Sequence, residues 1–201
     1  MPDPTTIEGW LDSLASTTPT PGGGAASAHT AATASALTRM VLGYALASPR
    51  LAGHEPHNQQ AADALDRARA RALELAQADA EAYGALNASF KLPKDDPDRA
   101  ERISRGAAGA VAPPTELLDL SAHILTCIES VLPTTSRMLS SDLAVAAALA
   151  EAAGRGAAWN IRANLGLLAS EEDPAGRATR ADEAVARCRA AAERIEAACR
   201  V

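Results

Sequence analysis

The chain has 201 residues and a formal net charge of −6 at pH 7; 47% of its residues are hydrophobic and only 2% are aromatic. Alanine alone accounts for 50 residues, so helix formers far outnumber the β-branched and aromatic residues that build strands. This composition excludes a β-sandwich or a parallel sheet, and the acidic balance argues against a non-specific nucleic-acid binder. We expect one all-α domain over residues 1–201, a bundle of six to seven closely packed helices.

Neither a membrane span nor a secretory signal is predicted. The sequence contains no run of about 18 uncharged apolar residues, and its start lacks a basic stretch followed by an apolar one. The cysteines Cys127, Cys188 and Cys199 form no CxxC pair, which favours reduced thiols. We therefore expect a cytoplasmic protein without a membrane partner.

The predicted elements follow one another in chain order. A short amphipathic segment over residues 7–14 precedes a Ser/Thr/Pro stretch that its prolines keep non-helical. Asn58 is the expected N-cap of the longest helix, and Pro113 and Pro114 are expected to stop or kink the chain between two others. Apolar spacing and breaking residues predict these further helices over residues 25–47, 58–90, 98–111, 115–132, 134–168 and 177–200.

Asp79 interrupts the apolar face of the helix predicted over residues 58–90. It shares a heptad spacing with Leu65, Ala72 and Leu86, which places a carboxylate in the middle of a buried stripe. Tyr83 follows four residues later on the same face and could share a cavity with it. The alternative is a structural aspartate that is paired with an arginine or a backbone group of a neighbouring helix.

A second unusual acid, Asp142, precedes a long apolar run. If the helix begins at residue 140 or at Ser141, Asp142 lies in the first turn, where the helix dipole favours a negative charge. Further along, Asn160 and Asn164 form an i, i+4 pair whose amides could face a planar heterocycle. Asn160 follows Asp142 by about 27 Å in a straight helix, so one small ligand cannot touch both within a subunit.

Three consecutive glycines, Gly22, Gly23 and Gly24, follow Pro21 and open the helix predicted over residues 25–47. Their backbone N–H groups could close on an anion or an oxyanion, or the turn could simply let two helices pack closely. His29 lies in the first turns of this helix, as a core histidine or as a titrating group near the cavity. We expect the segment over residues 54–57 to be a surface loop and predict no metal site.

The order of several motifs resembles the cyclodeaminase/cyclohydrolase family, which includes the C-terminal domain of formiminotransferase-cyclodeaminase and stand-alone methenyltetrahydrofolate cyclohydrolases. The resemblance covers residues 7–168. The motifs are Pro21-Gly22-Gly23-Gly24-Ala25-Ala26-Ser27-Ala28 with Arg39-Met40-Val41, Asp79-Ala80-Glu81-Ala82-Tyr83, Lys91-Leu92-Pro93-Lys94, Ala112-Pro113, Ser141-Asp142-Leu143 and Asn160-Ile161-Arg162-Ala163-Asn164-Leu165.

This resemblance implies a homodimeric, all-helical enzyme that acts on one-carbon units carried by tetrahydrofolate, without a metal or a further cofactor. Such enzymes release ammonia from a 5-formimino group as the methenyl bridge closes, or add water to that bridge to give 10-formyltetrahydrofolate. The chain carries no transferase domain, which favours the cyclohydrolase reaction. We expect Asp142 and Asp79 to supply acid/base catalysis in one desolvated hollow. The residues expected to hold the substrate are Gly22, Gly23, Gly24, His29, Tyr83, Ser141, Asn160 and Asn164.

Two segments depart from the family pattern and motivate alternative functions. Residues 42–50 lack the asparagine, threonine and lysine-rich run that members commonly carry, and residues 137–140 lack an asparagine before the Ser-Asp pair. The alternatives are a non-catalytic helical dimer or adaptor that retains the fold, and a relative that acts on another amidine or formyl substrate.

Overall fold

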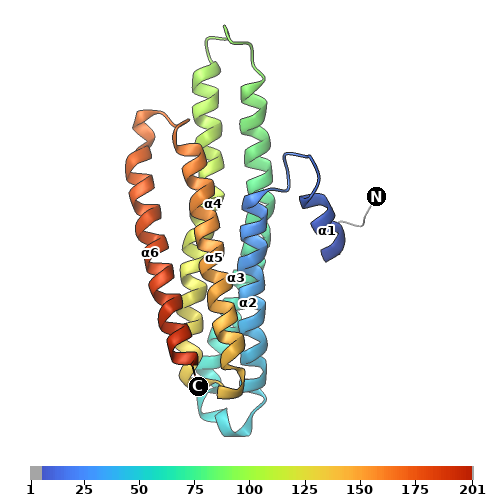
Figure 1. Ribbon diagram of the computed structural model, residues 1–201, viewed down its shortest axis with the longest axis vertical. Helices are drawn as coiled ribbons and strands as arrows, with labels where there is room; N and C mark the ends of the chain where they lie inside the picture. The colour runs from blue at the N-terminus through green and yellow to red at the C-terminus, as the bar shows by residue number, and fades with distance from the viewer. Residues whose placement is uncertain (1–5, 201) are drawn as a thin grey trace.

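The computed structural model describes residues 6–200, which form six α-helices joined by loops and short 3-10 turns, with no strand. This confirms the predicted all-α, single-domain class. Figure 1 shows the helices in chain order. Their bounds are α1 Ile7–Leu14, α2 Gly23–Leu46, α3 Glu55–Phe90, α4 Arg99–Val131, α5 Ser140–Leu165 and α6 Pro174–Cys199.

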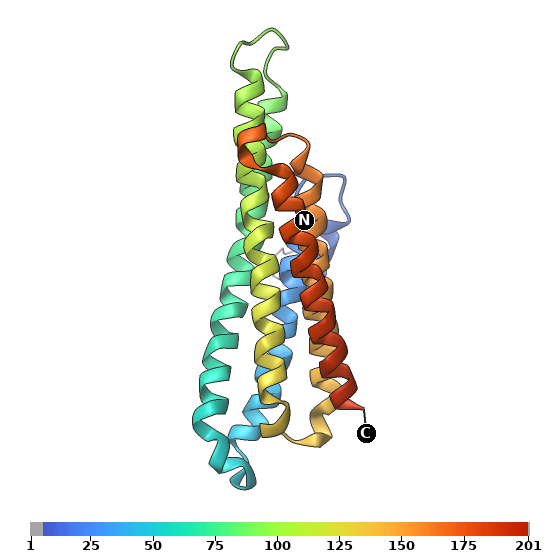
Figure 2. The ribbon, with the colours of Figure 1, turned by 90° about the vertical axis from the view of Figure 1, so that its left-hand side faces the viewer.

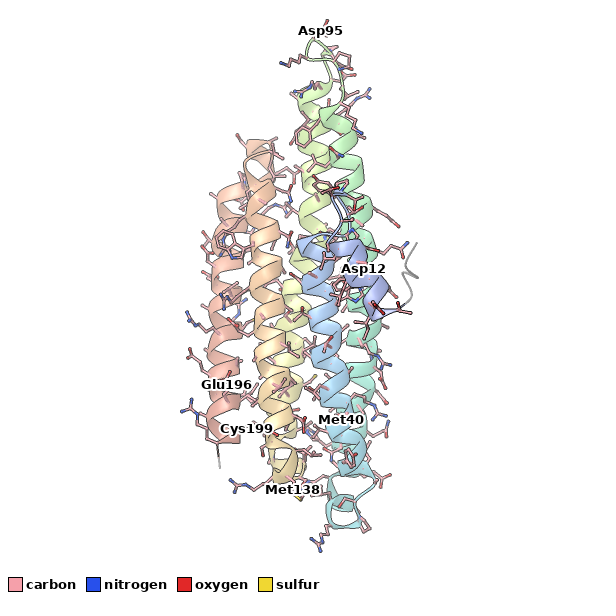
Figure 3. The ribbon with its side chains drawn as sticks, turned by 45° about the vertical axis from the view of Figure 1, so that its right-hand side comes forward. Asp12, Met40, Asp95, Met138, Glu196 and Cys199 are labelled. Atoms are coloured by element: carbon pink, nitrogen blue, oxygen red, sulfur yellow. The ribbon has the colours of Figure 1, made fainter. Side chains whose placement is uncertain are left out.

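Helices α2 to α6 form an antiparallel bundle in which α2 packs on α3 and α5, α4 packs on α3 and α5, and α6 covers α5 and α4. The α3–α4 hairpin extends beyond the other helices, and Asp95 marks its tip (Figures 2 and 3). Helix α1 lies beside α2, where the ring of Trp10 packs against His29 with ring centroids 4.5 Å apart. The bundle therefore has a closed lower end and an upper end from which only α3 and α4 continue.

Small residues set the distances between the helices, as the alanine content predicts. A Cβ atom on Gly156 of α5 would lie 2.1 Å from the Oγ of Ser27 on α2, so these helices approach too closely for a side chain at position 156. Gly154, one half-turn earlier, similarly faces Ser121 of α4 and Cys188 of α6. Because small side chains allow close backbone approach, α5 can contact α2, α4 and α6 together.

Several predicted boundaries are wrong. The segment over residues 54–57 is exposed but not a loop, since α3 begins at Glu55, and the helix predicted over residues 134–168 begins only at Ser140, after two short 3-10 turns. Helix α4 runs through Pro113 and Pro114 without a break, because packing against α3 and α5 holds both halves in line despite the missing N–H groups. Asn58 does not cap α3, which begins at Glu55. It is fully buried, and its side chain exchanges two hydrogen bonds with Thr134.

Among the described residues, one stretch, Arg99–Thr134, is long and apolar enough to cross a membrane by length and composition. This differs from the expectation that the chain holds no such segment. Ile124, Leu125, Ile128 and Val131 of this stretch are fully buried in the core of the bundle. A core helix of a bundle has this composition because several of its faces contact other helices.

Candidate active site

A cavity of about 200 Å³ lies where the first turn of α2 meets α3, α4 and α5. Its lining includes Pro19 and Thr20 of the loop between α1 and α2 and the first residues of α2; this end of α2 is the upper one in Figure 1. Most of its lining residues are among those predicted from the sequence, although they come from four separate segments. They are Pro19, Thr20, Gly22, Gly23, Gly24, Asp79, Tyr83, Ala110, Asn160 and Asn164.

The carboxylate of Asp79 lies directly against the backbone of α2. A Cβ atom at Gly24 would be 2.1 Å from Oδ2 of Asp79, so any side chain at position 24 would occupy the space of this carboxylate. The three glycines are the start of a helix and not a loop: Gly22 is the N-cap, and Gly23 and Gly24 are the first two helical residues. The absence of a side chain at Gly24 is what lets α3 present an acid at this point.

Asp79 is a partly buried carboxyl group without a charged partner among the described residues. Burial raises the pKa of its carboxyl above the ordinary value for aspartate, and no hydrogen bond or ion pair to another group opposes this effect within residues 6–200. The structural alternative required an arginine or a backbone partner, and none is found there. A carboxyl group whose pKa is raised toward the working pH can both accept and donate a proton.

Tyr83 lies one helical turn after Asp79 on the same face of α3. It lines the cavity while 41% of its surface is exposed, so it belongs to the rim. The structure thus confirms that the acid and the phenol border one cavity.

Two amides on α5 form the opposite wall. The Nδ2 of Asn160 donates to the carbonyl oxygen of Gly156 at 2.9 Å, and the Nδ2 of Asn164 donates to the carbonyl oxygen of Asn160 at 3.0 Å. These bonds fix which end of each amide is nitrogen, because only nitrogen can donate. Neither Oδ1 atom has a hydrogen-bond partner among the described residues, so both amides offer an acceptor for a ligand.

Ala110 of α4 also lines the cavity, and the helix leaves its carbonyl oxygen without the usual donor. In a helix its carbonyl oxygen would accept from the N–H of residue 114, or of residue 113 in a tighter turn. Both positions are proline, so neither has an N–H to donate. Our sequence interpretation missed this residue, although the Pro-Pro pair was the available signal.

The first turn of α2 supplies donors. The N-cap residue Gly22 has no side chain to bond the first N–H groups of the helix, and the first hydrogen bond from this end runs from the N–H of Ala26 to the carbonyl oxygen of Gly22. The N–H groups of Gly23, Gly24 and Ala25 therefore have no acceptor within the helix. The helix dipole adds positive potential at the same place.

The structure does not bring Asp142 to this cavity. Asp142 lies in the first turn of α5, at the lower end of the bundle, about 27 Å along the helix from Asn160. Ser141 is beside it and is exposed. One chain therefore cannot place Asp142 and Asp79 in a single hollow, contrary to our expectation, because a rigid helix keeps its two ends apart. The first-turn position fits the alternative in which the dipole stabilises this acid.

His29 does not line the cavity either. Its ring packs on Trp10 of α1, and burial lowers the pKa of this imidazole. It lies on the side of α2 that faces α1, because five residues separate it from Gly24 and turn it well away from Asp79. Within residues 6–200, no group of three or more His, Cys, Asp or Glu side chains is placed to hold a metal ion.

Comparisons with known proteins cover most of the chain. The sequence profile of the formiminotransferase-cyclodeaminase family matches residues 6–187. The methenyltetrahydrofolate cyclohydrolase of Methylorubrum extorquens is 30% identical over 163 residues, which cover 79% of this chain and 78% of that protein. The formimidoyltransferase-cyclodeaminase of Mus musculus is 29% identical over 176 residues, but these cover only 30% of that longer protein.

The fold also has a solved counterpart. The crystal structure of formiminotetrahydrofolate cyclodeaminase from Thermotoga maritima superposes with a TM-score of 0.84 over 96% of both chains, at 21% sequence identity. At this identity the likeness shows a shared fold. The profile match and the Methylorubrum relative together confirm the resemblance read from the motifs. The chain belongs to the formiminotransferase-cyclodeaminase family.

Proposed function

We propose that this chain is a folate one-carbon enzyme that hydrolyses 5,10-methenyltetrahydrofolate to 10-formyltetrahydrofolate. The observation that carries the proposal is the Asp79 carboxyl, which has a raised pKa, has no partner among the described residues and faces a cavity lined by the family's own motifs. The stand-alone cyclohydrolase of M. extorquens, of which the chain covers 78%, supports this reaction as the first candidate.

The reaction needs a group that moves protons next to a cationic carbon. Water adds to the methenyl carbon between N5 and N10 and loses a proton. The bond from this carbon to N5 then breaks, N5 takes up a proton, and the remaining hydroxyl proton is released to solvent as the formyl C=O forms. Ionised Asp79 would stabilise the cationic carbon and accept the proton of the attacking water, and the protonated form would return it to N5. Burial raises the pKa of this carboxyl, which makes its protonated form easier to reach than that of an exposed aspartate.

The second candidate is the cyclodeaminase reaction, which the names of the mouse and Thermotoga proteins favour. Here N10 attacks the formimino carbon on N5 and gives up its proton. The former imine nitrogen takes up two protons in all, one for each hydrogen it lacks, and leaves as ammonia. Asp79 could serve because the tetrahedral carbon and the departing nitrogen again need one acid/base group. No added cofactor or metal is part of either proposal. The site of action would be the cytoplasm, in keeping with three free cysteines.

Asp142 would enter the site from a second copy of the chain. Helices α2 and α5 lie side by side and antiparallel, and each exposes large apolar side chains: Met40 and Tyr44 on α2, Val145 and Trp159 on α5. A two-fold axis perpendicular to these helices would lay the lower end of one copy over the upper end of the other. Asp142 of the partner subunit would then lie level with Asn160, near Asp79.

The activity is tested with the purified chain and two substrates. We expect loss of the absorbance of 5,10-methenyltetrahydrofolate to be accelerated above the uncatalysed rate, and little ammonia from 5-formiminotetrahydrofolate. The opposite result would select the cyclodeaminase. Background rates with both substrates, for protein that is helical by circular dichroism, would reject the folate enzyme and favour the adaptor alternative.

The shared site is tested by mixing two inactive variants. If the active sites span a homodimer, Asp79→Asn and Asp142→Asn chains that are unfolded and refolded together should form mixed dimers with one intact site, which restores up to about a quarter of the activity. Each variant refolded alone is the control. Full activity of the Asp142→Asn variant alone would show that Asp142 takes no part in catalysis. A monomeric mass by light scattering would contradict the proposed homodimer.

A further inference from the structure

We propose that the α5 wall of the cavity reads the aminopyrimidinone edge of the substrate: Asn160 and Asn164 accept hydrogen bonds from its ring N–H and 2-amino groups, while the first N–H groups of α2 donate to its carbonyl oxygen. This inference rests on the proposed function, because it assigns a position to the pterin of a tetrahydrofolate. It also separates recognition on α5 from proton transfer on α3.

The α5 wall offers two free acceptors. Each amide nitrogen uses one of its two N–H groups on a carbonyl oxygen of its own helix, one turn earlier, and neither Oδ1 has a donor among the described residues. Ala110 lies on the adjoining wall, and neither proline that follows it has an N–H to bond its carbonyl oxygen. N–H groups of a ligand that lies against α5 would give the amide oxygens the donors that the protein does not supply.

The donors of the cavity lie next to these acceptors. A Cβ atom at Gly23 would be 3.6 Å from the Oδ1 of Asn160, which places the start of α2 in contact with this amide. The N–H groups of Gly23 and Gly24 have no acceptor in the helix. One edge of the cavity thus presents amide oxygens and backbone N–H groups side by side.

This order of groups matches one edge of the expected substrate. The pyrimidine ring of a tetrahydrofolate carries a 2-amino group, the N3–H and the O4 carbonyl in sequence, which is two donors followed by an acceptor. The matching protein edge has two acceptors followed by a donor, as Asn164, Asn160 and the first turn of α2 provide. Asp79 faces Gly24 from α3 and remains available to the reacting carbon.

The test compares two non-reacting ligands by isothermal titration calorimetry: 5-formyltetrahydrofolate and its analogue in which a methyl group replaces the 2-amino group. For the unaltered protein we expect the analogue to bind about tenfold more weakly, the loss of one well-placed hydrogen bond. In Asn164→Ala or Asn160→Ala this ratio should fall to about twofold or less in at least one variant, because the protein acceptor is gone.

Asn87→Ala is the matched control, since Asn87 is on α3 outside the lining residues, and it should keep the tenfold ratio. Equal binding of both ligands to the unaltered protein would overturn this inference while the proposed function stands. A tenfold affinity ratio that persists in both Asn160→Ala and Asn164→Ala would also overturn it, because another group would then bind the 2-amino group. Binding of neither ligand would instead count against the proposed function itself. Circular dichroism of each variant shows whether it has folded.

Discussion

Two polar residues on the same face of α3 have opposite environments. Asn58 and Asp79 are three heptads apart, so both occupy the stripe that also contains Leu65, Ala72 and Leu86. At the lower end, Asn58 is fully buried; its Nδ2 donates to the carbonyl oxygen of Thr134 at 3.1 Å and its Oδ1 accepts from the Thr134 hydroxyl at 2.7 Å. At the upper end, Asp79 meets a glycine backbone and a cavity.

The contrast between Asn58 and Asp79 distinguishes structural from functional polar residues in the core of a helical bundle. A buried group whose hydrogen bonds are satisfied within the protein stabilises one arrangement of the helices. A half-buried carboxyl group without a partner lowers stability, since burial disfavours its charged form. When a cavity lies beside such a group, a function in ligand binding or catalysis is indicated. The two residues should therefore respond differently to substitution.

The largest effect is expected at Asp79. Asp79→Asn keeps the shape of the side chain but removes proton transfer, so kcat/KM should fall by about 10²- to 10⁴-fold. Asp63→Asn, an exposed position on the same helix, is the control and should retain full activity. Steady-state assays with 5,10-methenyltetrahydrofolate measure both. Activity within threefold of the unaltered protein in Asp79→Asn would show that this carboxyl is not catalytic.

Gly24→Ala should reduce activity by about 10- to 100-fold, because the new methyl group would displace the Asp79 carboxylate by an ångström or more. The displaced atoms are the end of a flexible side chain, so α2 should still fold and circular dichroism should be unchanged. Gly84→Ala is the matched control: its Cβ would meet nothing within 4 Å. If Gly24→Ala and Gly84→Ala are equally active, the close approach of α2 to Asp79 has no catalytic importance.

At the lower end the effect should be on stability. Asn58→Ala leaves the carbonyl oxygen of Thr134 without its donor and the Thr134 hydroxyl with only its bond to the carbonyl oxygen of Val131. The free energy of unfolding should therefore fall by about 2 kcal/mol while kcat stays near its original value. The neighbouring exposed position supplies the control, Gln59→Ala, with a change below about 0.5 kcal/mol. Urea unfolding provides the measurement. If Asn58→Ala lost activity but not stability, the assignment of a structural role to Asn58 would be wrong.

The smallest effect concerns the pH dependence of stability. The folded-state pKa of Asp79 is raised, so the folded protein holds this proton more tightly than the unfolded chain does. The stability it contributes is complete below the unfolded pKa, about 3.9, and is lost as pH rises through the folded pKa. Asp79→Asn should therefore be more stable than the unaltered protein at pH 7, and this difference should vanish near pH 3. Urea unfolding of the variant and the unaltered protein from pH 3 to pH 7 measures this difference in the free energy of unfolding. A difference that stays constant over the range would refute the raised pKa.

Several features of the site were predictable because they depend on local spacing. The position of Asp79 in an apolar heptad stripe and the i, i+4 relations on α3 and α5 follow from a period of 3.6 residues. These rules correctly grouped Tyr83 with Asp79, and Asn160 with Asn164. They failed at Asp142, where sharing a motif set did not mean sharing a cavity within one chain.

The helical class follows from the amino-acid sequence, because alanine-rich segments with regular apolar spacing can bury their surface only as helices packed on one another. The residues that break the apolar faces can be identified in the same way. What these residues contact depends on the folded bundle: Asn58 contacts Thr134, and Asp79 contacts a glycine backbone and an open cavity. The folded bundle also keeps α4 continuous through Pro113 and Pro114. The reason is that a polar group's role depends on partners from distant segments, and helical periodicity carries no information about which segments become neighbours.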